Sequence, residues 1–300
     1  MKYVFIVNPK AGAGENEKTV RAAIENLPQK ENCEIYLTKA PGDAMNFVRE
    51  RSENEKDEKI VFVACGGDGT INEVMNGAAG HENAAVTCFP CGSGNDFVKC
   101  FENKNGFLDL SSLLEKEWKK IDLLKVGNRF SANVTNFGFD TTVAITINKE
   151  REKTGHGNKN AYTKGVVTAL IKSMKNECTV IADGETLNPD GKFLLCTAAN
   201  GQYVGGSFRC APRAKLDDGL MEVCLIKPIS RLRFVKILKP YTAGEHIDND
   251  EMKDIVVYRQ AKKVEVIAKP GFAYSLDGEI IHADRFTIEL VKNAVNFIAP

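Results

Sequence analysis

The sequence predicts an α/β protein in two parts: an N-terminal open, mostly parallel sheet flanked by helices over residues 1–125, and a C-terminal, mainly antiparallel β-sandwich domain over residues 126–300. The first part alternates apolar, strand-like runs with helical patterns, which is typical of a mostly parallel sheet covered by helices on both faces. After about Leu123, short strand-like runs follow one another between Gly, Pro and Asn turns. The last strand is a candidate to return to the first domain.

In the first part, the predicted strands are short apolar runs and the predicted helices carry apolar residues at helical spacing. Ile60–Ala64 is apolar throughout, as expected of a strand buried inside a parallel sheet. In chain order the predicted elements are strand Val4–Val7, helix Asn16–Leu27, strand Glu34–Leu37, helix Asp43–Glu53, strand Ile60–Ala64, helix Thr70–Ala79 and strand Ala84–Phe89.

In the second part, turn sequences such as Asp183-Gly184 and Asp277-Gly278 separate the strand-like runs. A single helix, about Ala161 to Met174, interrupts the series, and Ser230 is placed to cap a short second helix. The predicted strands are Phe130–Val134, Cys178–Ala182, Phe193–Ala198, Met221–Ile226, Asp254–Tyr258, Val264–Ile267 and Phe286–Leu290.

Composition excludes several classes of protein. The 300 residues carry 40 basic and 40 acidic side chains, and 43% of them are hydrophobic, which is incompatible with a mainly disordered chain. The zero net charge disfavours binding to nucleic acid through bulk positive charge, so we expect no nucleic-acid partner. No apolar run approaches the roughly 18 residues that a membrane-spanning helix needs. Nine scattered cysteines fit a reducing, cytoplasmic setting, and the C-x-x-C at Cys88–Cys91 is interpreted as structural.

The strongest local motif is Gly66-Gly67-Asp68-Gly69-Thr70, which follows a buried strand and opens a helix. Glycines allow a sharp turn and bring backbone N–H groups close to a ligand, and the helix N-terminus favours an anion. Thr70 is predicted to be the N-cap, with Glu73 three residues later completing a capping box. Because a tight turn alone does not require three glycines around one aspartate, the motif predicts phosphate binding.

Two further small-residue loops, Asn8–Gly14 and Pro90–Asp96, follow predicted strands and are expected at the same edge of the sheet. The chain contains no G-x-x-x-x-G-K-[ST] motif, and its glycines lack the G-x-G-x-x-G spacing. The loops therefore predict a nucleotide site that is neither a P-loop nor a Rossmann dinucleotide site.

These motifs resemble the catalytic domain of the diacylglycerol kinase family, which includes bacterial soluble lipid kinases and the sphingosine and ceramide kinases. The resemblance covers nearly the whole chain in the family's order, and it implies a nucleotide-binding kinase domain over residues 1–125 and a β-rich lipid or substrate domain over residues 126–300. Glycine-rich loops of the 66–70 type also occur in NAD kinases and phosphofructokinases, so the other landmarks decide the choice. They are Asn8-Pro9 with Gly12, Gly92–Asp96, Asn133 with Gly138-Phe139-Asp140, Ala214–Leu220 and Ser275–Glu279.

The resemblance implies the site residues of the family at matching positions. ATP would be bound by Asn8, Gly12, Thr38, Gly66, Gly67, Asp68, Gly69, Thr70, Ile71, Asn72, Ser93 and Asn95. A structural Mg²⁺ would be held by Asp218 and the backbone carbonyls of Lys215 and Leu220. The family's proton acceptor falls on Glu279, but Asp277 stands beside it and Asp68 faces the phosphates, so the base remains open among these three.

Phosphoryl transfer needs positioning and charge neutralisation, with magnesium on the phosphate oxygens. Asp68 and Asp96 are candidate ligands of that catalytic Mg²⁺, because Mg²⁺ prefers few, oxygen-bearing ligands. A carboxylate near the acceptor hydroxyl, Glu279 or Asp277, would take its proton. By itself, Asp277-Gly278 is more commonly explained as a hairpin turn.

A lipid acceptor requires access to a membrane surface. Between Lys227 and Lys239 five basic residues occur without an acidic one, and Leu232, Val235, Ile237 and Leu238 could add apolar surface to a helix capped by Ser230. Such a helix can lie on anionic lipid, or it can pack on the sandwich with its charges in water. The expected partner is thus a lipid substrate reached by transient, peripheral association, and the resemblance also allows a homodimer.

The sequence therefore predicts a cytoplasmic, ATP- and Mg²⁺-dependent lipid kinase whose default acceptor is diacylglycerol, giving phosphatidic acid. Two alternatives stay open: a kinase for another lipid or a soluble acceptor such as NAD, and a catalytically silent nucleotide or lipid sensor.

Overall fold

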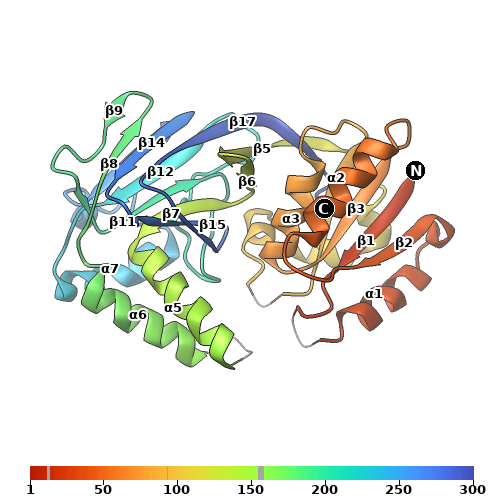
Figure 1. Cartoon of the computed structure of the whole chain (residues 1–300), viewed down its shortest axis with the longest axis horizontal. Coiled ribbons are helices and arrows are strands. Elements are labelled where there is room, and N and C mark those ends of the chain that lie inside the picture. Colours follow the sequence, from red (N-terminus) through yellow and green to blue (C-terminus); the bar gives the residue numbers. More distant parts are fainter. Residues whose placement is uncertain (12–13, 93, 155–158) are drawn as a thin grey trace. The chain divides into compact units, whose positions relative to one another are not determined.

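The computed structural model describes residues 1–11, 14–92, 94–154 and 159–300 (Figure 1). Contacts within the chain divide it into two compact units. Unit 1 comprises Met1–Leu123, Leu216–Asp218 and Val291–Pro300, and unit 2 comprises Leu124–Lys215 and Gly219–Leu290. We describe each unit by itself.

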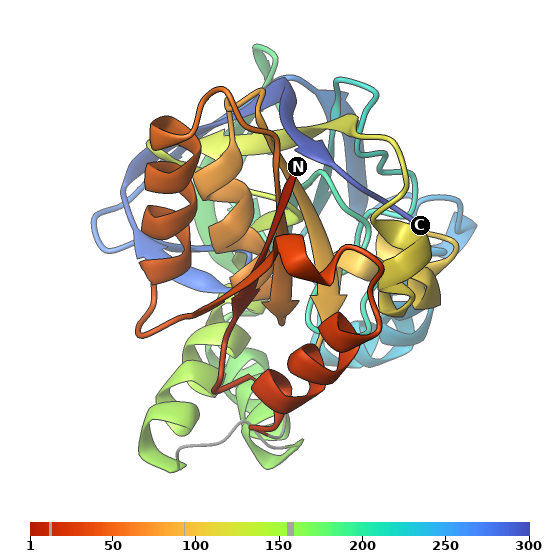
Figure 2. The ribbon, with the colours of Figure 1, turned by 90° about the vertical axis from the view of Figure 1, so that its right-hand side faces the viewer.

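Unit 1 contains a parallel sheet with strand order β4-β3-β1-β2, to which the C-terminal end of β17 adds a further parallel strand beside β4. Helices α2 and α3 cover one face of this sheet and α1 covers the other (Figure 2). The elements are β1 (Lys2–Val7), α1 (Asn16–Glu25), β2 (Cys33–Leu37), α2 (Asp43–Asn54), β3 (Ile60–Gly66), α3 (Asp68–Ala78), β4 (Ala84–Pro90), α4 (Leu110–Leu113), β5 (Lys119–Val126) and β17 (Arg285–Phe297). The predicted alternation of strands and helices is confirmed.

Strand β3 forms the centre of this sheet because both of its faces are apolar. All seven of its residues are buried between parallel neighbours β1 and β4, as its continuous apolar sequence predicts. Because β3 is packed on both faces up to Gly66, the glycine-rich loop begins at a well-fixed point of the sheet.

Unit 2 is built on two sheets. The first has the order β10-β8-β14-β17, with β9 on β8, β5 on β17 and β6 on β5. The second has the antiparallel order β13-β12-β11-β7-β15-β16. Their remaining strands are β6 (Arg129–Ser131), β7 (Val134–Gly138), β8 (Asn176–Ala182), β9 (Glu185–Thr186), β10 (Lys192–Phe193), β11 (Leu195–Ala199), β12 (Met221–Ile226), β13 (Val256–Ala261), β14 (Lys263–Ala268), β15 (Ala273–Leu276) and β16 (Glu279–His282).

The core of unit 2 lies between these two sheets, where residues of β8, β14 and β17 pack against residues of β7, β11 and β12. A second apolar cluster fills the other face of the β11–β12 sheet under three helices: α5 (Phe139–Thr154), α6 (Lys159–Lys172) and α7 (Arg231–Ala243). Figure 1 shows these helices together on one side of unit 2. The predicted C-terminal β-sandwich is thus confirmed.

Four details of the prediction for this part are wrong. The predicted strand Phe193–Ala198 is divided at Leu194 into β10 and β11. Ile237 of α7 was expected to add exposed apolar surface, but the sheet below α7 takes it into the core. Helix α5 was not expected, because its first half is rich in Thr, Val and Ile, which favour strands in isolation. The predicted strand Phe130–Val134 is divided into β6 and β7, because the backbone N–H groups between them turn to the carboxylate of Asp277.

Candidate active site

The loop between β3 and α3 presents backbone N–H groups at the start of a helix. Gly67 is the N-cap, and its carbonyl accepts hydrogen bonds from the N–H groups of Thr70 (3.0 Å) and Ile71 (3.1 Å). The N–H groups of Gly67 and Gly69 have no hydrogen-bond partner among the residues that the structure describes. Since the helix dipole adds positive potential at this end, the loop can hold an anionic group such as a phosphate.

The predicted capping box at this helix is wrong. The helix begins at Asp68 rather than after Thr70, and the Thr70 side chain is buried against Gly66, where any Cβ would collide with it. The carboxylate of Glu73 instead accepts the N–H groups of Gly42 (2.9 Å) and Ala44 (3.2 Å). Glu73 therefore stabilises the start of α2, because the tight packing of α2 on α3 brings that end within reach.

The loop after β4 lies directly against the β3–α3 loop. A Cβ atom at Gly92 would overlap the Cα atom of Gly67, so the two backbones approach as only glycines allow. Asn95 adopts a left-handed conformation (φ 50°) and its Nδ2 donates to the carbonyl of Gly92 at 2.8 Å. Its Oδ1 is buried without a hydrogen-bond partner among the described residues, so this loop keeps an unused acceptor.

Asp68 joins the two loops. Its Oδ1 accepts the N–H of Phe97 at 3.0 Å, and its Oδ2 lies 3.0 Å from the position of a Cβ at Gly94. The ring of Phe97 packs edge-on against Phe297 with centroids 5.4 Å apart, which holds this segment in the core of unit 1. The Asp68 carboxylate is thereby oriented toward the loop after β4.

The neighbouring carboxylate of Asp96 is nearly buried and forms an ion pair with Lys99 at 2.8 Å. Asp68 and Asp96 thus both contact the segment that follows the loop after β4. Two carboxylates suit Mg²⁺, which takes one or two carboxylates together with phosphates and waters. Within residues 1–11, 14–92, 94–154 and 159–300, no three His, Cys, Asp or Glu side chains gather as metal ligands. A metal here would therefore need the phosphates to complete its coordination.

The remaining loops of this edge follow β1 and β2. Asn8 Oδ1 accepts the N–H of Lys10 at 3.0 Å, while Asn16 Nδ2 donates to the carbonyls of Asn8 (3.1 Å) and Ala11 (2.8 Å). Thr38 follows β2, and its N–H donates to the carbonyl of Val7 at 2.9 Å. Parallel strands end at one edge, so these residues share the edge with the glycine loops. Gly12 and Ser93 lie outside the described residues.

Two predicted contacts lie deeper in α3. The side chain of Ile71 is buried in the core, and its N–H is already bonded to Gly67, so Ile71 serves packing. Asn72 is also buried, and its carbonyl and Oδ1 accept from Asn76 Nδ2 at 2.9 and 3.1 Å. Their predicted role in nucleotide binding rests on the resemblance alone.

In unit 2, Asp277 closes the turn between β15 and β16 with left-handed backbone angles at Asp277 (φ 48°) and Gly278 (φ 92°), as in a two-residue hairpin. Its carboxylate accepts Ser131 Oγ (2.7 Å) and three consecutive backbone N–H groups, those of Ala132 (2.7 Å), Asn133 (3.2 Å) and Val134 (2.7 Å). The Asp277 oxygens therefore hold the β6–β7 segment in place.

Glu279 follows this turn and faces Arg129. The guanidinium donates to both carboxylate oxygens, Nη1 to Oε1 at 3.3 Å and Nη2 to Oε2 at 2.7 Å, and the Glu279 side chain is 55% exposed. Arg129 was missed from the sequence because it lies 150 residues away and belongs to no recognisable motif.

The segment predicted to hold a structural Mg²⁺ is one short loop. Lys215, Asp218 and Leu220 span six positions around Gly219, whose positive φ of 77° turns the chain there. The carbonyl of Leu216 is fixed by the N–H of Asp122 at 2.6 Å. One carboxylate and two carbonyls are oxygen ligands of the kind that Mg²⁺ accepts, so the donor set fits, with waters completing it.

Asp140, a landmark of the resemblance, lies in the first turn of α5. Burial raises its pKa from 3.8 to about 6, although Asn136 Nδ2 lies 3.4 Å from one carboxylate oxygen. This carboxyl therefore takes up its proton at a higher pH than an ordinary aspartate, and once protonated it can donate a hydrogen bond as well as accept one.

The surroundings of the C-x-x-C motif disfavour the thiolate form of both cysteines. Burial raises the pKa of Cys88 well above its usual value and also raises the pKa of Cys91, and both are free thiols. The structural interpretation of this motif agrees with these surroundings.

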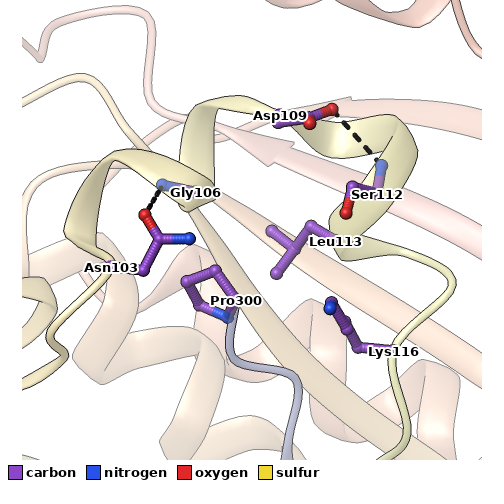
Figure 3. Close-up of a pocket in the computed structure, with 7 residues that line it drawn as sticks. All are labelled: Asn103, Gly106, Asp109, Ser112, Leu113, Lys116 and Pro300. Carbon is purple, nitrogen blue, oxygen red and sulfur yellow. Dashed lines mark hydrogen bonds between the residues drawn. The ribbon is translucent and has the colours of Figure 1, made fainter.

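A small pocket of about 80 Å³ lies elsewhere in unit 1 (Figure 3). Its polar residues Asn103 and Asp109 accept backbone N–H groups of their own helical turns, those of Gly106 and Ser112. The pocket contains none of the predicted site residues, and its size suits a few waters rather than a nucleotide. Among the helices of the described ranges, none is long and apolar enough to cross a membrane.

Comparison with known proteins agrees with this arrangement of loops. Residues 2–126 match the model of the diacylglycerol kinase catalytic domain, and residues 133–299 match that of the YegS C-terminal NAD kinase beta sandwich-like domain. A probable lipid kinase YegS-like from Alcanivorax borkumensis is 25% identical over 288 residues, which is 95% of this chain and 93% of the relative. A diacylglycerol kinase from Bacillus subtilis is 26% identical over 280 residues, covering 92% and 88%.

Among solved structures, a putative diacylglycerol kinase from Bacillus anthracis str. Sterne aligns with a TM-score of 0.73 over 100% of this chain and 97% of that one, at 23% identity, which supports the fold. The two matched domains together account for nearly the whole chain. With the glycine loops in unit 1 and the sandwich in unit 2, the chain belongs to the family of diacylglycerol kinases and YegS-like lipid kinases.

Proposed function

We propose that this lipid kinase transfers the γ-phosphate of ATP to the hydroxyl of diacylglycerol and releases phosphatidic acid and ADP. The observation that carries the proposal is the pairing of unbonded N–H groups at Gly67 and Gly69 with the carboxylate of Asp68, all at the first turn of α3. Amide groups of this kind bind phosphate oxygens, and an adjacent carboxylate provides a metal ligand.

In the proposed reaction, the acceptor oxygen bonds to the γ-phosphorus as the bond from that phosphorus to the β-γ bridging oxygen breaks. ADP leaves with the bond's electron pair, and the hydroxyl proton passes to a protein carboxylate. Gly67 and Gly69 would orient the phosphates, and the Asp68 and Asp96 carboxylates would hold Mg²⁺, which would neutralise the phosphate charge. Since these groups are fixed before ATP arrives, little reorganisation is needed during transfer.

Glu279 is the carboxylate that we propose as proton acceptor. Four donors already engage the two oxygens of Asp277, and Asp68 is placed beside the phosphate loops, whereas the Glu279 side chain is more than half exposed and accessible to a substrate. Arg129 contacts both Glu279 oxygens and so acts as a positioning residue.

The roles of this pair can be separated kinetically. Glu279→Gln should lower kcat by about 10²-fold or more, because the amide cannot take a proton. Arg129→Gln should lower kcat less, because Glu279 keeps its carboxylate but loses a fixed orientation. Full turnover by Glu279→Gln would remove Glu279 from the mechanism and return the choice to Asp277 and Asp68.

The Asp218 loop is proposed to hold a structural Mg²⁺. The expected signature is thermal stabilisation of the wild type by Mg²⁺ without ATP, and its loss in Asp218→Asn. Equal shifts in both proteins would contradict a metal site at this loop.

The acceptor is tested with γ-labelled ATP and a panel of diacylglycerol, ceramide, sphingosine and NAD, with product identified by chromatography. Labelled phosphatidic acid formed faster than any other product is the expected result. Preferential labelling of NAD would favour the soluble-acceptor alternative, and no transfer to any acceptor, with ATP still bound, would favour a silent sensor.

A further inference from the structure

Glu73 of α3 uses its carboxylate to close the start of the neighbouring helix α2. Its Oε1 accepts the N–H of Gly42 at 2.9 Å, and its Oε2 accepts the N–H of Ala44 at 3.2 Å. Gly42 is the N-cap of α2 and has no side chain with which to cap the helix itself. The carboxylate of Glu73 therefore satisfies two N–H groups that a helix start leaves without a partner inside the helix.

Glu73 also holds one end of the loop between β2 and α2, residues 38–42, which we name the β2–α2 loop. The other end is held by Asp43, whose carboxylate accepts the N–H of Lys39 at 2.8 Å and the hydroxyl of Tyr36 at 3.0 Å. The contacts of Asp43 lie within its own segment of chain, whereas Glu73 reaches the loop from another helix. Glu73 therefore ties the position of this loop to α3.

Helix α3 is a firm support for this contact because it packs closely on α2. The two helices lie side by side on one face of the sheet (Figure 2). A Cβ atom at Gly77 would lie 2.6 Å from the carbonyl oxygen of Met45 and 2.7 Å from Cβ of Val48, so only glycine permits this approach. Glu73 lies between this contact and the first turn of α3. One helix thus carries both the open N–H groups of that turn and the carboxylate that holds the β2–α2 loop.

The β2–α2 loop lies on the side of the phosphate loop that is available to the rest of a nucleotide. The sheet order places β1 between β3 and β2, so the ends of β3 and β2 are about 10 Å apart at the usual strand spacing. On the other side of β3, Gly92 lies against the backbone of Gly67. A nucleotide with its phosphates at the first turn of α3 would therefore extend toward β1 and β2, and the β2–α2 loop is within its length.

We propose that Glu73 is a positioning residue for nucleotide binding, because its carboxylate keeps the β2–α2 loop in the conformation that receives the nucleotide. The inference rests on the proposed function in that the nucleotide is ATP, and it does not depend on the acceptor. A loop that is ordered before binding loses less conformational entropy when the ligand arrives, so its order contributes to affinity. Since Glu73 touches no reacting atom, it should act on the KM for ATP rather than on kcat.

The test is the dissociation constant of the Mg²⁺ complex of a non-hydrolysable ATP analogue, measured by titration calorimetry on the full chain. Glu73→Ala should raise this constant about tenfold, because the released loop must be ordered on binding. Glu73→Gln keeps one acceptor oxygen and should raise the constant less. In steady-state assays the KM for ATP should rise in the same order, while kcat should stay within about twofold of the wild type.

Two control variants separate positioning from stability and from charge. Val48→Ala removes buried side-chain volume where α2 meets α3, so it should lower the melting temperature at least as much as Glu73→Ala. Its nucleotide affinity, measured well below every melting transition, should equal that of the wild type. Glu53→Ala removes an exposed glutamate from α2 and should change neither quantity. Hydrogen exchange over residues 38–44 should be faster in Glu73→Ala than in Glu53→Ala.

The outcomes distinguish this inference from the proposed function. Wild-type affinity or unchanged hydrogen exchange in Glu73→Ala would overturn the positioning role even if the kinase is active. Equal losses of affinity in Glu73→Ala and Val48→Ala, in step with melting temperature, would also overturn it, because they would show a purely structural role. Weaker binding confined to the Glu73 variants, with no wild-type transfer to diacylglycerol, would support the positioning role and reject that acceptor. Absence of nucleotide binding in the wild type would reject both.

Circular dichroism like that of the wild type establishes that the variants are folded. If Glu73→Ala does not fold, Glu73→Gln gives the same comparison with a smaller expected change, because the amide fills the same space as the carboxylate. Wild-type affinity in a folded Glu73→Gln would then overturn the proposal, and a raised dissociation constant together with an unchanged one in Val48→Ala would support it.

Discussion

The β3–α3 loop of unit 1 and the β15–β16 turn of unit 2 use an aspartate and neighbouring backbone N–H groups in opposite ways. In unit 2, Asp277 binds three consecutive N–H groups and a hydroxyl, so the polar groups of that segment are satisfied within the protein. In unit 1, the N–H groups of Gly67 and Gly69 beside Asp68 have no partner among the described residues.

The difference indicates which aspartate maintains the fold and which is placed for a ligand. Hydrogen bonds that are satisfied internally stabilise a turn, whereas donors left open at a helix start can be satisfied by an incoming phosphate. Substitution at Asp277 should therefore affect stability, and substitution at Asp68 should affect catalysis.

The largest effect is expected for Asp68→Asn, which should lower kcat by about 10²–10³-fold because the metal and phosphates lose a charged ligand. The amide oxygen can still accept the N–H of Phe97, so the melting temperature should stay within the range of the exposed control Asp57→Asn. Steady-state kinetics and calorimetry measure the two quantities. A loss of stability in parallel with activity would make Asp68 a structural residue like Asp277.

Next, Asp277→Ala should lower the free energy of unfolding by about 3 kcal/mol, because three N–H groups lose their acceptor. Denaturant titration measures this, with the exposed turn residue Asp190 (Asp190→Ala) as control. Asp277→Asn should cost less, since asparagine tolerates the positive φ and keeps one acceptor oxygen. If Asp277→Ala leaves the free energy of unfolding unchanged, Asp277 does not stabilise the fold and the proposed difference between the two aspartates is wrong.

The carboxyl of Asp140 differs from the other two because burial, and no charged partner, sets its pKa. Its pKa is about 6 in the folded state and 3.8 ordinarily. Between these two pH values the folded protein binds one more proton at Asp140 than the unfolded protein does, so the free energy of unfolding falls as pH rises. The loss should be about 2 kcal/mol from pH 4 to pH 6 relative to Asp140→Asn, in which this term vanishes.

The comparison with Asp140→Asn also removes the contribution of His246. Burial lowers the pKa of this histidine to about 4, so it changes stability with pH in the opposite sense and equally in both proteins. A difference between the two unfolding free energies that does not vary with pH would refute the raised pKa of Asp140.

The smallest effect concerns the contact of the two glycine loops. Gly92→Ala should lower the free energy of unfolding by about 1–2 kcal/mol, because its Cβ meets the backbone of Gly67. Gly69→Ala should be neutral or slightly stabilising, because a Cβ there meets nothing within 4 Å and alanine favours helix. Equal losses in both variants would show that the loops are not in the close contact described.

Much of unit 1 could be predicted from sequence because its signals are local. The apolar run of β3 and the glycines after it dictate a buried strand and a sharp turn whatever surrounds them. The capping assignment of Thr70 and Glu73 failed because the carboxylate of Glu73 binds N–H groups at positions 42 and 44, about thirty residues earlier in the chain. Helix α5 was missed for a related reason, since packing on the β11–β12 sheet overrides the strand preference of its threonines and valine.

By itself, the sequence determined the two-part α/β and β-sandwich architecture and the three small-residue loops, because strand period, glycine and turn chemistry act over a few residues. Only the tertiary structure decided that Asp277 serves the β6–β7 segment and that Arg129 faces Glu279. Each of these depends on hydrogen bonds or packing between residues far apart in the chain, and the partner of a side chain at such a distance has no local signature.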